Sequence, residues 1–407
     1  MQFGPRKESA SRRASLQRVL VLGAAILVMG SVLGACGGEE PSSAPACPSA
    51  EYPAAGALNI TDGTVEWLVC SPDEASRTVI GASDDVVLIE ENGSAGLRTI
   101  AFDAADGSER WSHRTADTPI PPGPFDGKGI VVLATDDRGA LALVGVDAVT
   151  GQEKWRVESS EAPLAHSATV AVVWNVADPG AGQQLRGIGL RGIDRVTGDE
   201  LWVSDTPLSD ESGVCCKNSP AAVLGDVLAV PTGATVTAID MRTGATLWKA
   251  PQLDHPTAAD GLFVGTRETS GTPGTNGPPP APPAITAIDA ASGQERWTAP
   301  GRPSYGGAFA VGDGVIVVES GGPDLIAYKL SSGDERWRAT RTVHIEPQLI
   351  NGKSLVMLWE GELSVLSATD GATIWSATQP FGSPLMNNLG SNGASVFVAI
   401  NSVPWTD

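Results

Sequence analysis

Two adjacent cysteines, Cys215 and Cys216, are the residues of this chain best placed for redox chemistry. Neighbouring cysteines can close a vicinal disulfide, an eight-membered ring that strains the peptide bond between them. Cys47 and Cys70 offer two further thiols, and a bridge between them would pin the segment before residue 57 to the first strand of the fold. Crossed bridges between the two pairs are equally compatible with the sequence, so the connectivity stays open.

Three of the four histidines, His166, His255 and His344, are the candidate metal ligands, and they recur at equal intervals of 89 residues. We expect each to start the innermost strand of every second repeat of the fold derived below, where they could ring one mouth of a central channel. Zinc needs ligand nitrogens about 2 Å from one centre. Strands of alternate repeats lie too far apart for that, so repeat register explains the spacing and we predict no metal site.

Cys36 carries a different chemistry, because it ends an apolar run typical of an export signal. Residues 1–18 are basic and polar, and Val19–Leu33 are apolar but too short for a comfortable membrane span. Leu33-Gly34-Ala35-Cys36 resembles the bacterial lipobox, in which the chain is cut between the alanine and the cysteine. The cysteine sulfur then takes a lipid, with palmitate among its usual acyl chains.

The N-terminal residues therefore divide into an export signal and a tether. We predict a lipoprotein signal peptide over residues 1–35, and a lipidated Cys36 with a flexible tether, rich in Pro, Ser and Ala, over residues 36–56. A plain secretory signal is the alternative. Residues 11–16 also resemble a twin-arginine export signal, although Ser15 stands where an aromatic residue is usual, so both export routes stay open.

A repeated block determines the expected fold. Glycine is followed four residues later by tryptophan in eight places, and successive tryptophans lie 38–49 residues apart. Each block combines an alternating strand, a turn of the form Asp-x-x-Thr-Gly and a second strand that carries the tryptophan. A large ring at one place in every repeat can fill the gap between neighbouring sheets. The predicted structural residues are Trp67, Trp111, Trp155, Trp202, Trp248, Trp297, Trp337 and Trp375.

Four-stranded repeats of this length are the blades of a β-propeller. The first block follows the tether too closely for two strands to precede it. The last block, ending at Trp375, is followed by two strand-like runs around 384–390 and 394–400. These two pairs would complete one shared blade. We therefore predict an all-β, eight-bladed propeller over residues 57–407, or seven blades if residues 58–69 lie outside the ring.

The block Asp-x-x-Thr-Gly-x-x-x-Trp resembles the PQQ-like repeat of a propeller family, over roughly residues 57–400. The full pattern occurs at 147–155, 194–202 and 240–248, whereas Asn59, Lys329 and Ser367 replace the aspartate elsewhere. The family includes quinoprotein alcohol dehydrogenases, which hold the quinone PQQ against a vicinal disulfide with a Ca²⁺, a catalytic Asp and an Arg. It also includes the non-catalytic lipoprotein of the outer-membrane barrel-assembly machinery, to which this chain is similar in anchor, repeat and size.

The residues favour the non-catalytic kind of member. No segment aligns with the calcium, Asp and Arg elements of the dehydrogenases, and the chain has no catalytic-triad order, phosphate loop or His-Glu-x-x-His motif. We predict no catalytic residue, no metal and no cofactor. The formal net charge of −20 argues against nucleic acid as a partner.

The longest irregular segments are expected on the face opposite the Thr-Gly turns, where partners would bind. Tolerated insertion is the alternative reading of these segments, which are Asp178–Gly187, Ser204–Pro220 and Glu268–Ala284. We predict a scaffold, lipid-anchored on the extracytoplasmic face of a bacterial cell membrane, that binds a protein, peptide or ligand of the envelope. The alternative is a PQQ-dependent dehydrogenase or a small-ligand sensor that uses the central channel. The oligomeric state stays open.

Overall fold

The computed structural model describes the propeller part of the chain and Cys47 before it. The described residues are 47, 52–71, 74–115, 125, 129–135, 141–158, 163–176, 187–204, 221–232, 235–267, 284–301, 309–320, 324–340, 346–351, 353–359, 362–378 and 386–400. The predicted signal peptide, Cys36 and the first part of the predicted tether lie outside these residues, as do Cys215 and Cys216.

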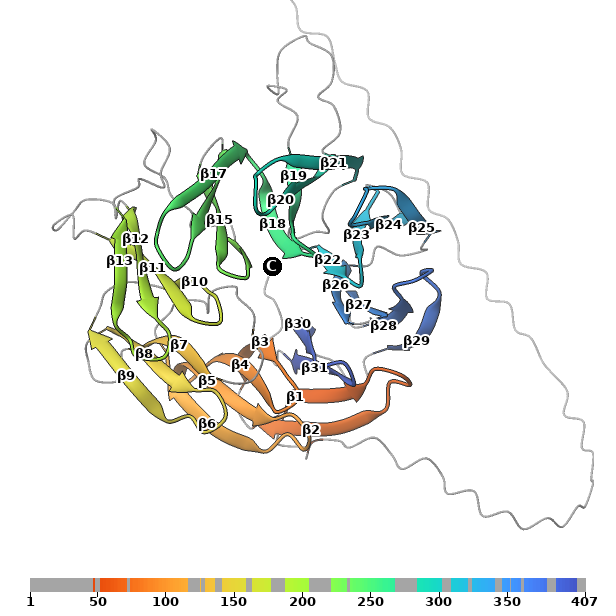
Figure 1. Cartoon of the computed structure of the whole chain (residues 1–407). Coiled ribbons are helices and arrows are strands. Elements are labelled where there is room, and N and C mark those ends of the chain that lie inside the picture. The colour runs from red at the N-terminus through yellow and green to blue at the C-terminus, as the bar shows by residue number, and fades with distance from the viewer. Residues whose placement is uncertain are drawn as a thin grey trace, which may run out of the picture. The chain divides into compact units, whose positions relative to one another are not determined.

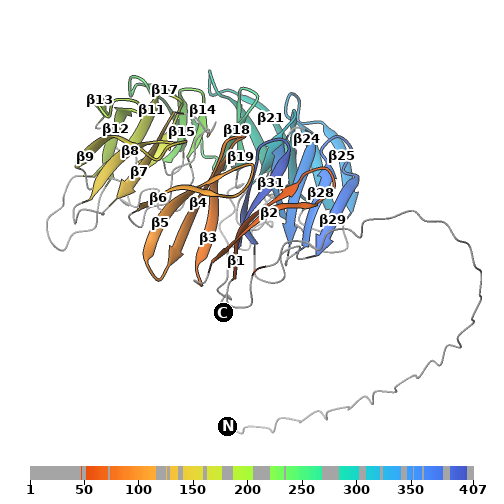
Figure 2. The same cartoon turned by 90° about the horizontal axis from the view of Figure 1, so that it is seen from below.

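The described residues form eight antiparallel sheets, seven with four strands and one with three, and no helix. None of them therefore forms a helix able to cross a bilayer. Figure 1 shows the sheets arranged as blades around a central axis, and the view in Figure 2 shows neighbouring blades side by side. The prediction of eight blades is confirmed. The alternative of seven is wrong, because residues 58–69 contribute to two strands inside the ring.

The strands of each blade follow in order from the ring centre outward. Blade 1 consists of β30 (Met386–Ser391), β31 (Ser395–Ile400), β1 (Tyr52–Asn59) and β2 (Val65–Ser71). Blade 2 consists of β3 (Ser76–Ala82), β4 (Val86–Gly93), β5 (Gly96–Asp103) and β6 (Glu109–Arg114). Blade 3 is described by β7 (Ile130–Thr135), β8 (Ala142–Asp147) and β9 (Glu153–Glu158). Blade 4 consists of β10 (Pro163–His166), β11 (Val170–Val176), β12 (Gly187–Asp194) and β13 (Glu200–Ser204).

The second half of the ring repeats the same order. Blade 5 consists of β14 (Ala222–Leu224), β15 (Val227–Thr232), β16 (Thr235–Asp240) and β17 (Thr246–Pro251). Blade 6 consists of β18 (Asp254–Ala259), β19 (Leu262–Arg267), β20 (Ala284–Asp289) and β21 (Glu295–Pro300). Blade 7 consists of β22 (Ala310–Gly312), β23 (Val315–Glu319), β24 (Asp324–Lys329) and β25 (Glu335–Thr340). Blade 8 consists of β26 (Glu346–Asn351), β27 (Ser354–Trp359), β28 (Glu362–Ser367) and β29 (Thr373–Thr378).

Blade 1 joins the two ends of the described chain. β1 pairs antiparallel with β31, from Ala55 opposite Ala399 to Asn59 opposite Ser395, and its other edge pairs with β2. The shared blade predicted from the sequence is therefore present. β1 begins at Tyr52, so the propeller takes in the last five residues of the segment predicted to be tether, and the boundary placed at residue 57 is too late.

The core is a ring of eight interfaces. Each of the eight hydrophobic clusters combines side chains from two neighbouring blades. The middle strands have neighbours on both faces, so they are apolar almost throughout, as in β7 and β23, where every residue is buried. The outer strands keep one face toward solvent. Burial of apolar surface between blades, rather than within one blade, is the main source of stability.

Candidate functional site

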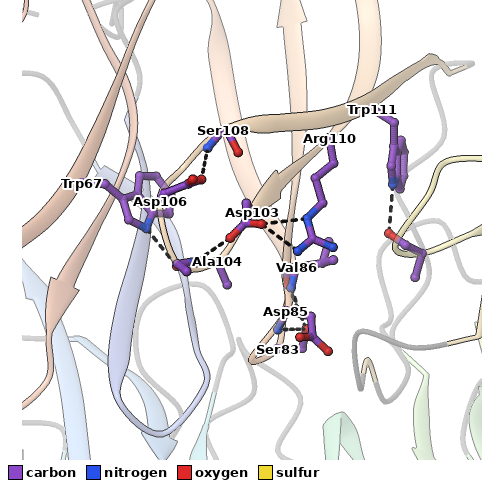
Figure 3. Close-up of polar contacts among 12 residues, drawn as sticks. Trp67, Ser83, Asp85, Val86, Asp103, Ala104, Asp106, Ser108, Arg110 and Trp111 are labelled. Carbon is purple, nitrogen blue, oxygen red and sulfur yellow. Dashed lines mark hydrogen bonds and ion pairs between the residues drawn. The ribbon is translucent and has the colours of Figure 1, made fainter.

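Each repeat tryptophan forms a hydrogen bond to the following blade. The indole Nε1 of Trp67 donates to the carbonyl oxygen of Ala104 at 2.9 Å, and Trp111 donates to that of Ala148 at 2.9 Å (Figure 3). The remaining six bonds, at 2.7–2.9 Å, run from Trp155 to Arg195, Trp202 to Met241, Trp248 to Ala290, Trp297 to Leu330, Trp337 to Ala368 and Trp375 to Ile60. All eight tryptophans predicted to be structural thus lie at blade interfaces.

The glycine of each block receives the tryptophan ring of the preceding blade. A Cβ atom at Gly107 would lie 2.5 Å from the ring of Trp67, and one at Gly151 would lie 2.4 Å from Trp111. Both glycines also have a positive φ, +71° and +69°, which disfavours any other residue. The block therefore acts across two interfaces, with its glycine at one and its tryptophan at the next.

The aspartate that opens the turn holds the turn backbone. One carboxylate oxygen of Asp147 accepts hydrogen bonds from the backbone N–H and the hydroxyl of Thr150, both at 2.9 Å. These bonds, the backbone one first, hold the pKa of Asp147 below its ordinary value. Asp289 combines a hydrogen bond and ion pair from Arg296 with bonds from Ser292, which lowers its pKa to about 2.

A second arginine–aspartate pair occupies the same place in blade 2. Arg110 bonds Asp103 at 2.7 Å, as Figure 3 shows, and this contact is the main reason why the pKa of Asp103 is lowered. These carboxylates are ionised at neutral pH, and they accept hydrogen bonds from the backbone of their own turns. A proton donor or acceptor for catalysis needs a pKa near the working pH, so these aspartates act as turn caps.

The family whose model is described as outer membrane protein assembly factor BamB matches residues 54–191, 181–274 and 283–402. The chain belongs to this family. The matched residues contain all eight Gly–Trp contacts between blades. The BamB family pattern and the interlocking repeat therefore describe the same part of the chain. No curated protein sequence matches the chain.

Two solved structures with TM-scores above 0.5 share the propeller fold at low identity, and a third similar structure scores below that value. BamB from Moraxella catarrhalis is 16% identical with a TM-score of 0.52, and the match covers 80% of this chain and 99% of that one. The computationally designed Ika8 protein is 15% identical with a TM-score of 0.54, covering 80% and 97%. The quinohemoprotein alcohol dehydrogenase ADHIIG from Pseudomonas putida HK5 is 13% identical with a TM-score of 0.47, covering 82% and 72%.

Of the cysteine pairings that the sequence allowed, the structure contains Cys47 with Cys70, whose Cα atoms lie 5.6 Å apart. Cys70 lies near the end of β2, on the side of the blade opposite the turn at Gly63. The bond fixes the chain before β1 to the outer strand of blade 1. It also leaves Cys215 and Cys216 without Cys47 or Cys70 as partners.

The histidines do not ring one mouth of the channel. His166 is the last residue of β10, whereas His255 is the second residue of β18. The innermost strands of the blades run in the same direction, so these two residues lie toward opposite ends of the ring axis. The prediction that His166 starts its strand is therefore wrong. His344 lies outside the described residues.

The described residues hold no cluster of His, Cys, Asp and Glu side chains that could bind a metal ion. Arg77, on the innermost strand β3, is 1% exposed and bonds Glu91 at 2.7 Å. Arg98 bonds the other oxygen of Glu91 at 2.6 Å, so Glu91 bridges two arginines of blade 2.

The three irregular segments predicted to form a binding face lie almost wholly outside the described residues. The strands that flank these segments are described. Their ends next to the segments lie at the blade ends opposite the Thr-Gly turns. Cys70 lies toward the same side. The topology therefore gathers the strand ends that lead into these segments, and the attachment point of the N-terminal segment, on one face of the propeller.

Proposed function

We propose that this chain is a non-catalytic scaffold of the bacterial envelope, lipid-anchored through Cys36 and bound to a protein or peptide partner. The observation that carries the proposal is membership, over most of residues 54–402, of a family described as an outer membrane assembly factor. The repeat residues, which are the strongest motif of the sequence, serve the blade interfaces. A ring interlocked in this way suits the rigid presentation of a binding surface.

The Cys47–Cys70 bond supports the extracytoplasmic location. Disulfides persist in oxidising compartments and are rare in reducing ones. The bond also shortens the proposed tether, because Cys47 lies only eleven positions after Cys36. Such a segment spans at most about 40 Å when fully extended. The anchor would then hold the long-loop side of blade 1 close to the membrane.

Acyl labelling and fractionation of cells test the anchor. We expect the wild-type chain to incorporate labelled palmitate and to sediment with membranes. The Cys36→Ser variant should lose the label, and it should either leave the membrane or accumulate as uncut precursor. The matched control is Cys47→Ser with Cys70→Ser, which removes two other cysteines and should keep the label. Processed, membrane-bound Cys36→Ser protein, or labelling of that variant, would contradict the proposal.

A further inference from the structure

The interface between blade 2 and blade 3 differs from the other seven at one place on the third strand. The residue at this place pairs with the residue two positions after the repeat tryptophan, so it shares the tryptophan's face of the sheet and points toward the following blade. In blade 2 this residue is Thr99, which pairs with His113. In the other blades it is apolar, and the residues are Ala55, Leu143, Leu190, Val236, Ile285, Leu325 and Leu363.

The hydroxyl group of Thr99 is buried without a hydrogen bond. Thr99 is 0% exposed, and its Oγ1 has no hydrogen-bond partner among the described residues. Removing a hydroxyl from water without giving it a new partner costs free energy. A valine of nearly the same shape, like Val236 in blade 5, would fill the space without that cost. The hydroxyl of Thr99 therefore calls for a partner that the described chain does not provide.

A second hydroxyl in the same condition lies close by. Thr115 is 6% exposed, and its Oγ1 also lacks a hydrogen-bond partner within the described part of the chain. The backbone N–H of Thr115 donates to the carbonyl oxygen of Leu97 at 3.0 Å, which extends the pairing of β5 with β6 by one residue. Thr115 and Thr99 are therefore diagonal neighbours on one face of the sheet, and their Cβ atoms lie within about 8 Å of each other. One water molecule can bridge two hydroxyl groups held in this way.

His113 adds a third polar group to this face. It lies opposite Thr99 and two residues before Thr115. Its Nε2 is 2.8 Å from the carbonyl oxygen of Gly151 in blade 3. A carbonyl oxygen only accepts, so Nε2 carries the proton and the Nδ1 atom of the neutral ring is an acceptor. Two hydroxyl groups and one imidazole acceptor thus share one face, and a buried water molecule typically makes about three hydrogen bonds.

Contacts with blade 3 enclose this face. The indole of Trp111, on the same face of β6, bonds Ala148 of blade 3 (Figure 3). Thr135, the last residue of β7, is 2% exposed and donates from its Oγ1 to the carbonyl oxygen of Arg114 at 2.8 Å. The three polar groups therefore lie between two blades. They lie on the long-loop side of the ring, because β6 runs away from its Thr-Gly turn and ends just before Thr115.

We propose that one ordered water molecule is bound between Thr99, Thr115 and His113. The two hydroxyl groups donate to the water oxygen, and one O–H of the water donates to Nδ1 of His113, so all three groups gain a partner. The water occupies the interface of blades 2 and 3 at a place where each of the other interfaces has an apolar side chain. The inference does not depend on the proposed scaffold function or on the lipid anchor.

A double-mutant cycle on the purified full-length protein tests the proposal. Thr99→Val and Thr115→Val each remove one partner of the water and leave the other hydroxyl buried. Each variant should therefore lower the midpoint of urea unfolding. The variant with both changes keeps neither hydroxyl, so its midpoint should fall by clearly less than the sum of the two single shifts.

The equivalent place in blade 5 supplies a matched control. Val236→Thr puts a hydroxyl there, but the residue paired with it is Ala250, which cannot share in binding a water molecule. The buried hydroxyl should then remain without a partner and lower the midpoint of urea unfolding. A hydroxyl at this place of a blade should thus stabilise blade 2 and destabilise blade 5.

A crystal structure of the wild-type protein is the second measurement. It should show a solvent oxygen within hydrogen-bond distance of both hydroxyl groups and of Nδ1 of His113. Single variants at Thr99 and Thr115 that raise the midpoint or leave it unchanged would overturn the proposal. So would a crystal structure in which the two hydroxyl groups bond each other or another protein group, or in which a side chain fills the space between them. The crystal structure decides even if a variant misfolds.

Discussion

The indole nitrogen of Trp375 donates a hydrogen bond to the carbonyl oxygen of Ile60, 2.8 Å away and 315 positions earlier in the chain. This bond closes the ring of eight such contacts, because it joins blade 8 to blade 1. The ring of Trp375 also packs against Gly63, as each of the other repeat tryptophans packs against the glycine of the following blade. Ring closure therefore uses the same contact as every other interface.

Removing one buried ring should destabilise the whole propeller. Trp297 is 8% exposed and bonds Leu330, so Trp297→Ala should lower the free energy of unfolding by about 3–5 kcal/mol. Leu247→Ala, at a residue 45% exposed, is the control and should cost less than about 1 kcal/mol. Denaturant unfolding measures both. A loss at Trp297 no larger than that of the control would mean that the interface contact contributes little.

The repeat glycines should be less tolerant of a side chain than other glycines of the same backbone conformation. Gly107 (φ +71°) meets the Trp67 ring, whereas Gly261 (φ +80°) has nothing within 4 Å of an added Cβ. Both Ala variants adopt a left-handed conformation at a cost of about 1–2 kcal/mol. Gly107→Ala should add about 1–3 kcal/mol from overpacking. Equal unfolding free energies for the two variants would exclude the packing role.

The buried charge cluster of blade 2 should be sensitive to loss of its acid. Glu91 lies between Arg77 and Arg98, with side-chain exposures of 7%, 1% and 35%. Glu91→Gln would remove the buried carboxylate that pairs with Arg77 and should cost about 3–5 kcal/mol. Glu335→Gln breaks an exposed pair with Arg338 at 2.8 Å and should leave the free energy of unfolding nearly unchanged. Chemical denaturation of the two variants gives the comparison.

The Asp289 turn should lose its stabilising contacts in acid. Its pKa is lowered from 3.8 to about 2, chiefly by the hydrogen bond from Arg296. A carboxyl whose pKa is depressed on folding stabilises the fold above its ordinary pKa, and this contribution disappears as the pH falls toward 2. In a carboxyl NMR titration, Arg296→Ala should move the pKa of Asp289 up toward 3.8. An unchanged pKa in that variant would show that Arg296 is not the cause.

The sequence predicted the repeat well because the relevant signals are local. Turn geometry needs a glycine with positive φ at fixed spacing from the tryptophan, and both residue types are visible in any single copy. The partners of the tryptophans are not local. Trp67 bonds Ala104, 37 residues later, and Ala104 has no feature in the sequence that marks it as an acceptor.

The remaining features depended on strand register. Glu91 lies opposite Arg77 in the pairing of β3 with β4, and opposite Arg98 in the pairing of β4 with β5. No sequence motif predicts this register. The histidines show the opposite problem. The repeats differ in length, so histidines spaced 89 residues apart do not occupy equivalent strand positions. His166 ends β10, whereas His255 is the second residue of β18. The Cys47–Cys70 pairing was one of several that composition alone allowed.

Cys215 and Cys216 should pair with each other. Cys47 and Cys70 are bonded together, so Cys215 and Cys216 would be left as neighbours in the oxidising compartment that we propose for the chain. Peptide mapping without reductant should find both in one internally bridged peptide. Free thiols at both positions, or linkage of either to Cys47 or Cys70, would contradict this expectation.

Intact mass measurement of the protein purified from its own membranes tests the central claim of a lipid-anchored, non-catalytic scaffold most directly. Under denaturing conditions, we expect the mass of a chain that begins at Cys36, with an acyl lipid added and four hydrogens lost to two disulfides. Under native conditions, the mass should show no added quinone or metal ion, and the absorbance spectrum should show no quinone band. A bound quinone with Ca²⁺, or an unlipidated chain that begins at another residue, would contradict the account.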